Sequence, residues 1–190
     1  MRSLTTIALL ALGVSSHCQE DLVFFAPMDG TCEPVLGNPA VTLEMDSDLK
    51  AAPGVHDQAM GISGDCRYDL GGAFPVNAGT FAAWVSPFWR GTDDVVRTLL
   101  SVYGPGTRAE SWRASRWTVV AGQGEARFFV YPGDGGKAAT VAASIDGWLP
   151  DRWHHVAAVW DGLAGADGEL MLYVDGELAG SVAGLDLAAD

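Results

Sequence analysis

The sequence is poor in cysteine and in basic residues, and both shortages restrict the chemistry it can perform. Of its 190 residues only three are cysteine, namely Cys18, Cys32 and Cys66. They form no C-x-x-C motif, and no neighbouring pair of histidines completes a tetrahedral metal site with them. Lysine and arginine number 11 against 24 aspartates and glutamates, which gives a formal net charge of −13. Because nucleic acids and anionic membrane surfaces bind clustered cationic charge, this composition argues against both as partners.

Long apolar runs are also missing, apart from one short run at the N-terminus. Arg2 supplies a positive charge, residues 5–14 are apolar, and Ser16 follows Val14 at the small-residue spacing that signal peptidase requires. The run is too short to cross a bilayer as a helix. It therefore predicts a cleaved leader.

We expect residues 1–18 to be a signal peptide, cleaved after Ser16 or after Cys18. A lipoprotein site at Cys18 is the alternative, but His17 stands where such a site needs a small residue. The mature chain, residues 19–190, is then secreted or extracytoplasmic, with no membrane insertion after the signal is removed.

Export would place the two remaining cysteines in an oxidising compartment, where thiols form disulfides. We predict a disulfide between Cys32 and Cys66. In the chain-entropy model, a closed loop of about 34 residues stabilises the fold by roughly 3–4 kcal/mol. Two buried free thiols are the open alternative.

Strand and turn signals recur along the chain, because β-branched and aromatic runs are separated by Gly, Pro, Asn and Asp. Prolines make residues 31–53 an irregular segment. The sequence predicts strands at 22–28, 60–62, 66–70, 79–87, 97–103, 126–131, 138–145, 153–160, 170–174 and 177–183. The fold class is therefore all-β.

The most distinctive stretch lies between Arg152 and Glu177. It contains W-H-H-V-A, then Trp160-Asp161-Gly162, and then L-Y-V-D-G. This spelling resembles the central signature of LamG-like (concanavalin A-like) jelly-roll domains, as do F-x-P-M-D-G near the start and G-T-F within residues 79–87. The resemblance implies a two-sheet antiparallel β-sandwich that binds carbohydrate or protein.

The resemblance covers residues 22–185 and departs from the family near the end. The family continues through further strands, including an acidic D-E-x-apolar strand that returns beside the first one. We therefore expect a domain over 19–190 that lacks its closing C-terminal strands, and an exposed, association-prone edge at residues 22–28. An alternative interpretation is that the chain is the N-terminal, accessory domain of a larger exported enzyme or adhesin.

Arginine and tryptophan are concentrated in the middle of this acidic chain. Six of the 11 basic residues lie between positions 90 and 127, interleaved with three tryptophans. Indole faces stack on sugar rings, and guanidinium groups bind carboxylate or sulfate. This favours Trp112, Arg113 and Arg116 as ligand-binding residues. The alternative is that arginine stems pack over sandwich tryptophans, with cation–π contact as a by-product.

Catalysis has weaker support. Glu44, Asp46 and Asp48 alternate as in the E-x-D-x-x-E motif of glycoside hydrolases on this fold, but Leu49-Lys50 breaks the pattern. A solvated polar strand is the preferred interpretation, and calcium binding stays open. The adjacent histidines His154-His155 point to opposite faces of a strand and are interpreted as structural.

The sequence therefore predicts an exported, non-catalytic recognition module that binds a glycan or an extracellular protein. No cofactor or catalytic residue is expected.

Overall fold

The computed structural model describes residues 5–8, 22–36, 43–46, 49–62, 65–68, 74–103, 116–132 and 137–187. Within these ranges every regular element is a β-strand, and the strands pair in antiparallel fashion. The predicted all-β class is confirmed. In this part of the chain, no helix is long and apolar enough to cross a membrane.

The chain folds as two compact units, and strand β6 (Gly79–Pro87) runs through both. The larger unit consists of residues 75–82, 89–150 and 154–190. The smaller unit consists of residues 1–74, 83–88 and 151–153.

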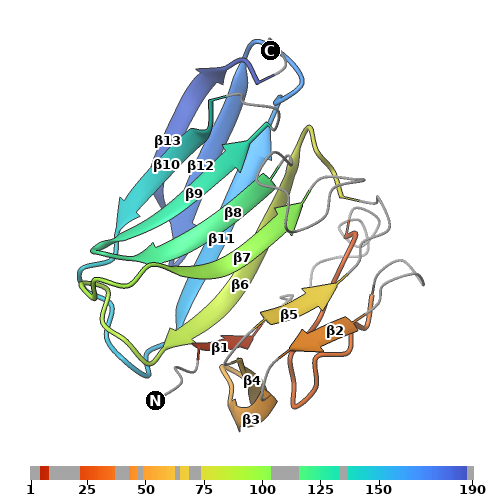
Figure 1. Cartoon of the computed structure of the whole chain (residues 1–190), viewed down its shortest axis with the longest axis vertical. Helices are drawn as coiled ribbons and strands as arrows, with labels where there is room; N and C mark the ends of the chain where they lie inside the picture. The colour runs from red at the N-terminus through yellow and green to blue at the C-terminus, as the bar shows by residue number, and fades with distance from the viewer. Residues whose placement is uncertain are drawn as a thin grey trace. The chain divides into compact units, whose positions relative to one another are not determined.

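The larger unit is a sandwich of two antiparallel sheets (Figure 1). One sheet has the order β10-β9-β8-β7, and the other has the order β13-β12-β11-β6. The bounds of these strands are β7 Arg97–Tyr103, β8 Arg116–Gly122, β9 Glu125–Tyr131, β10 Ala139–Ser144, β11 His154–Asp161, β12 Gly168–Val174 and β13 Glu177–Leu185. The predicted two-sheet sandwich is confirmed.

The strands form where apolar residues recur with the period of two that a half-buried strand requires. In β9 the buried residues are Ala126, Phe128 and Val130, and the residues between them are partly exposed. In β10 burial alternates strictly over Ala139–Ser144. The alternation sends one face of each strand into the core.

Aromatic side chains from both sheets form the centre of this core. Phe128 of β9 packs edge-on against Phe81 of β6 at a centroid distance of 5.8 Å and lies 6.3 Å from Trp160 of β11. Trp160 is 1% exposed, and its indole N–H donates to the carbonyl oxygen of Pro75 at 2.9 Å. Trp160 was predicted to be core and is confirmed as such, whereas Trp153 is half-buried.

The smaller unit contains the order β6-β1-β4-β3 and a separate pair, β2 with β5. Their bounds are β1 Thr5–Ala8, β2 Leu43–Asp46, β3 Leu49–Pro53, β4 Gln58–Ile62 and β5 Asp65–Tyr68. An apolar cluster around Met28, Cys32 and Met60 accompanies them. The Tyr68 hydroxyl donates to the carbonyl oxygen of Cys32 at 2.7 Å, and its ring lies 4.7 Å from Phe24.

The predicted strand at 22–28 is wrong. The structure has only an isolated bridge between Phe25 and Leu36, in which the Phe25 N–H donates to the Leu36 carbonyl at 2.9 Å. Pro27 has no N–H to donate to a ladder, and Met28 turns the chain with a φ of 58°. The chain therefore packs here as an irregular segment.

Four of the observed strands were not predicted. One is β1, which lies in the segment predicted to be a signal peptide. β2 and β3 lie in the segment 31–53 that was expected to be irregular, and β8 lies in the arginine- and tryptophan-rich stretch. Ladder bonds with β5, β4 and β9 form these strands despite weak local signals. Asp48 lies outside the described residues.

Candidate functional site

Three loops meet at one end of the sandwich in the larger unit, at the lower left of Figure 1. They are residues 89–96 between β6 and β7, the turn Gln123-Gly124 between β8 and β9, and residues 145–150 after β10. Backbone hydrogen bonds join them. Gly124 N–H donates to Gly91 O at 2.7 Å, and Ile145 N–H donates to Gly124 O at 2.8 Å. The three loops therefore form one connected framework.

Glycine makes this close approach possible. A Cβ atom at Gly91 would collide with the carbonyl oxygen of Ile145, and one at Gly122 would collide with that of Val95. Gly122 also has a φ of 139°, which side chains disfavour. The two glycines thus allow the backbones of neighbouring loops to lie in direct contact.

Two shallow hollows lie over these loops, with volumes of about 300 and 280 Å³. They share Gln123, Gly124 and Asp146, so they are two parts of one surface, here called the loop cleft. The other lining residues are Thr92, Asp94, Glu125, Ala142, Ala143 and Ser144. Most of these side chains carry oxygen atoms that accept hydrogen bonds.

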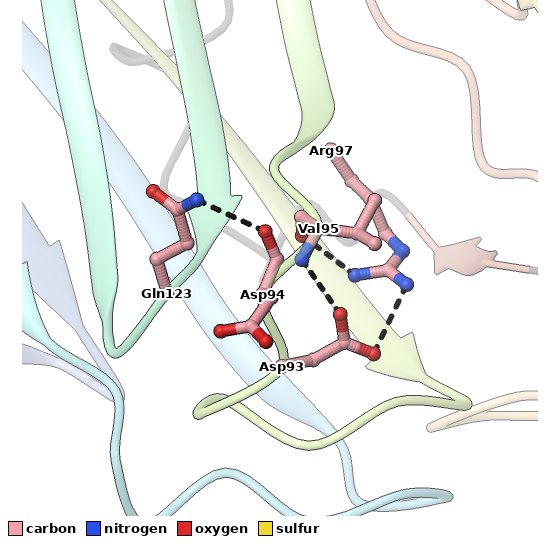
Figure 2. A network of polar contacts seen from close by, with 5 residues as sticks. All are labelled: Asp93, Asp94, Val95, Arg97 and Gln123. Atoms are coloured by element: carbon pink, nitrogen blue, oxygen red, sulfur yellow. Dashed lines mark hydrogen bonds and ion pairs between the residues drawn. The ribbon is translucent and has the colours of Figure 1, made fainter.

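Gln123 is held in the loop cleft by two hydrogen bonds to the loop of residues 89–96. Its backbone N–H donates to the Asp93 carbonyl at 2.7 Å, and its side-chain amide donates to the Asp94 carbonyl at 2.9 Å. Figure 2 shows the side-chain amide oxygen of Gln123 on the side away from Asp94. At the end of β10, Ser144 Oγ donates to Oδ2 of Asp146 in the following loop at 3.2 Å. Bonds within the protein thus orient both groups before any ligand arrives.

Asp93 anchors the loop that carries Asp94. Its carboxylate accepts the Val95 N–H at 2.7 Å and pairs with the Arg97 guanidinium at 3.2 Å (Figure 2). The Val95 hydrogen bond, followed by Arg97, lowers the pKa of Asp93 below its ordinary 3.8. Asp93 therefore stays ionised, and both of its carboxylate oxygens have partners within the protein. Asp94, by contrast, is exposed at the loop cleft.

The same loops carry a row of stacked side chains. The Arg97 guanidinium lies 4.9 Å from the Trp89 ring, and Trp89 lies 6.1 Å from Trp148. Trp148 in turn stacks on His154 at 4.4 Å with an interplanar angle of 5°. Both tryptophans are only 4% exposed, so they are packing residues and present no face to a ligand. For Trp89 and Arg97 the packing interpretation is confirmed.

The residues predicted to bind ligand are only partly described. Trp112 and Arg113 lie outside the described residues. Arg116 begins β8, with its backbone in register with Tyr103 and Tyr131. Their role in binding stays a prediction.

The histidine pair serves the fold. His154 Nδ1 lies 2.9 Å from an Asp175 carboxylate oxygen, and the His155 backbone N–H donates to the other oxygen of the same carboxylate at 2.8 Å. Burial lowers the pKa of His155 below 6.5, and the nearby Asp175 charge opposes that shift. Both rings are half-buried, not one buried and one near the surface as expected.

The other candidate residues belong to the smaller unit. Cys32 is 3% exposed, and Cys66 lies on β5 two residues before Tyr68, whose hydroxyl reaches Cys32. The disulfide stays a prediction.

Glu44 and Asp46 lie on β2. Among the described residues, no group of three or more His, Cys, Asp or Glu side chains is arranged to hold a metal ion.

Sequence analysis missed the loop cleft because its residues form no motif. They come from three loops that are far apart along the chain, and each looks like ordinary turn chemistry in isolation. Asp93-Asp94, Gln123-Gly124 and Asp146-Gly147 are the signals that could have marked the three turns.

Comparison with known proteins agrees with this architecture. The family model of the concanavalin A-like lectin/glucanases superfamily matches residues 65–189. The chain belongs to this superfamily. No curated protein and no solved structure matches it. Membership confirms the resemblance found in the sequence and indicates binding of carbohydrate or protein, whereas the ligand depends on the site that this particular chain builds.

Proposed function

We propose that this chain is an exported, non-catalytic recognition module that binds neutral, hydroxyl-rich carbohydrate at the loop cleft. The observation that carries the proposal is the cleft itself, a shallow surface whose polar side chains come from three backbone-linked loops. Carboxylate, amide and hydroxyl groups exchange hydrogen bonds with sugar hydroxyls. Rigid support of these groups lowers the entropic cost of binding.

The negative charge of the loop cleft restricts the class of glycan that can bind there. Asp94, Glu125 and Asp146 line it, and the chain carries a net charge of −13. A sulfated or uronic-acid glycan would be repelled, whereas a neutral glycan would not. The Trp112, Arg113 and Arg116 segment predicts the opposite preference, since guanidinium groups select anionic sugars.

The absence of turnover is part of the proposal. Strand β6 is spelled G-T-F-A-A-W-V-S-P and carries no carboxylate that could act as acid or nucleophile. At the cleft, Ser144 has the carboxylate of Asp146 as its partner rather than an imidazole that could activate it. These features support binding without catalysis.

A protein ligand is the second candidate. Three apolar side chains on two of the same loops are unusually exposed: Val95 at 54%, Val96 at 41% and Leu149 at 44%. Exposed apolar residues beside a polar surface are typical of protein contacts. An accessory domain of a larger exported enzyme or adhesin could use either kind of contact.

Affinity electrophoresis in neutral and anionic polysaccharides tests these alternatives. We expect retardation in a neutral polysaccharide that is lost in Gln123→Ala and Asp146→Asn. Asp161→Asn, the same change at an exposed position at the far end of β11, is the matched control and should bind as the parent does.

Three other outcomes would redirect the proposal. Retardation confined to anionic polysaccharide, and lost in a Trp112→Ala, Arg113→Ala, Arg116→Ala triple variant, would move the site to that segment. Loss of binding to a protein ligand in Val96→Ser and Leu149→Ser alone would favour the second candidate. Hydrolysis of any polysaccharide that Glu44→Ala abolishes would contradict the non-catalytic assignment.

A further inference from the structure

Aspartate followed directly by glycine occurs six times in this chain, and this pair of residues is chemically reactive. The backbone nitrogen of the glycine can attack the side-chain carboxyl carbon of the aspartate, because the two groups are held close together by the chain itself. Glycine has no side chain to obstruct the attack. The six pairs begin at Asp29, Asp134, Asp146, Asp161, Asp167 and Asp175. The pair at Asp134 lies outside the described residues.

Three of the described pairs are held by strands of the larger unit. Asp161 ends β11, and its backbone is in register with Glu169 of β12. Gly168, which follows Asp167, is the first residue of β12 and is buried. Both carboxylate oxygens of Asp175 are bonded to residues of β11. Ring closure at any of these pairs would require strand pairing or carboxylate hydrogen bonds to break.

The pair Asp29-Gly30 of the smaller unit is held as well. Asp29 Oδ1 accepts the Gln58 backbone N–H at 3.1 Å, and the Gly30 N–H donates to the Met28 carbonyl at 3.1 Å. The Gln58 side chain also crowds Gly30. Neither the carboxylate nor the attacking nitrogen is free here.

The pair Asp146-Gly147 differs from these four. Both residues are exposed in the turn that follows β10. Among the described residues the Gly147 N–H has no hydrogen-bond acceptor, and a Cβ atom added at Gly147 would meet nothing within 4 Å. The Asp146 carboxylate accepts from Ser144 Oγ at 3.2 Å through Oδ2, which leaves Oδ1 open to solvent. The attacking nitrogen is therefore free, and the space around it is open.

We propose that Asp146 is a modification site, at which the folded chain converts aspartate to isoaspartate without an enzyme. Gly147 N bonds to Cγ of Asp146 in its acid form. The N–H proton and the carboxyl OH leave together as water, and a succinimide ring forms. A water molecule then opens the ring. Attack at Cγ restores aspartate, whereas attack at the backbone carbonyl carbon of Asp146 leaves the chain linked through Cγ, which is isoaspartate.

Isoaspartate at this position would alter the loop cleft. The new linkage adds one methylene group to the backbone of the turn and shortens the arm that carries the carboxylate. The turn is closed by the Trp148 N–H, which donates to Ile145 O at 2.9 Å, and Trp148 O accepts the Gly91 N–H at 3.0 Å. A longer backbone shifts Trp148 relative to Ile145, so the modified protein should bind carbohydrate more weakly. This consequence rests on the proposed function, whereas the modification itself does not.

Peptide mapping of aged protein tests the modification. The chain is kept for several weeks at neutral pH and physiological temperature, either folded or unfolded in guanidinium chloride. Mass spectrometry with electron-transfer fragmentation then quantifies isoaspartate at each pair. The unfolded sample gives the intrinsic rate of every pair, so the comparison isolates the effect of the fold.

Folding should slow the reaction at Asp146 by less than about threefold, because the turn is already open to it. At Asp29, Asp161, Asp167 and Asp175 folding should slow it by more than about tenfold, since those sites react only after local opening. Protection at Asp146 equal to that at the other four positions would overturn the proposal.

Gly147→Ala is the matched variant. Its methyl group obstructs the attack but meets no atom within 4 Å, so the variant should fold as the parent does. Isoaspartate at Asp146 should accumulate about tenfold more slowly in this variant, with the other pairs unchanged. An unchanged rate at Asp146 would show that Gly147 N is not the nucleophile and would overturn the proposal.

Two readouts on the aged samples separate the modification from the proposed function. Retardation in neutral polysaccharide should decline in the parent as isoaspartate accumulates and should persist in Gly147→Ala. Near-ultraviolet circular dichroism reports on Trp148, which stacks on His154, and should change in the aged parent whether or not carbohydrate binds. A parent that isomerises at Asp146 but never binds polysaccharide would overturn the proposed function and support the modification. Full binding by isomerised protein would overturn the effect on the loop cleft.

Discussion

Asp175 ties the turn between β12 and β13 to the first residues of β11. One of its carboxylate oxygens lies 2.9 Å from His154 Nδ1, and the other accepts the His155 backbone N–H at 2.8 Å. The residue has a φ of 53° and precedes Gly176 with a φ of 85°, so the reversed turn directs the carboxylate back to β11.

We predict that Asp175→Ala destabilises the fold by about 1–2 kcal/mol, because it removes two hydrogen bonds and places alanine at a positive φ. Asp175→Asn should cost less, since asparagine tolerates that φ and can still accept one bond. Urea denaturation measures both. The control Asp161→Asn should stay within about 0.5 kcal/mol of the parent. An Asp175→Ala variant as stable as that control would contradict the role given to this carboxylate.

Stability should fall in mildly acidic solution because of His155. Burial lowers the pKa of its imidazole in the folded protein below the ordinary value of 6.5. The unfolded chain therefore binds more protons than the folded chain between the two pKa values, and stability rises with pH there. The contribution is complete above about pH 6.5 and is lost as pH falls through the folded-state pKa. Thermal melts at intervals from pH 8 to 5 measure it, and His155→Gln should flatten the profile. An equally steep profile in that variant would assign the effect to other groups.

The loop framework predicts opposite effects on stability for alanine substitutions at two of its glycines, Gly91 and Gly147. Gly91→Ala would drive a Cβ into the Ile145 carbonyl, whereas a Cβ at Gly147 would meet no atom within 4 Å. We expect Gly91→Ala to cost about 3 kcal/mol or more and Gly147→Ala to cost less than about 0.5 kcal/mol. Chemical denaturation of the two variants checks this. Similar stabilities would mean that the backbone contact between the loops is not tight.

The disulfide prediction has an equally direct check. Export would place Cys32 and Cys66 in an oxidising compartment, where thiols form disulfides. We therefore expect a Cys32–Cys66 bridge in the exported protein, with a stabilisation of roughly 3–4 kcal/mol. Intact-mass measurement after alkylation, with and without reduction, should reveal the bridge. Alkylation of both thiols in unreduced, denatured protein would exclude it.

The elements that the sequence predicted best are those with strong local signals. The bounds of β6 and β7 agree with the predicted ranges 79–87 and 97–103, because β-branched and aromatic residues fill both strands and turn residues flank them. The hairpin of β11 and β12 was predicted for the same reason, and Asp175-Gly176 marked the next reversal.

The elements that were predicted wrongly, or not predicted, depend on signals of a different kind. Arg116 and Trp117 suggested binding chemistry, yet both belong to β8, the strand that pairs with β7 and β9. Pro27 was overlooked as a strand breaker in residues 22–28. The loop cleft could not be predicted from the sequence, because long-range backbone hydrogen bonds, such as that from Gly124 N–H to Gly91 O, bring its residues together.

The central claim is that the loop cleft contacts carbohydrate, and nuclear magnetic resonance mapping tests it most directly. A neutral oligosaccharide selected by the electrophoresis would be titrated into the isotope-labelled protein. The account predicts that the largest shifts occur at the backbone amides of Thr92, Asp94, Gln123, Gly124 and Asp146, and at the side-chain amide of Gln123. Asp161 and the β12–β13 turn should not respond. Shifts that cluster within residues 104–117 and leave Gln123 and Asp146 unchanged would contradict the claim.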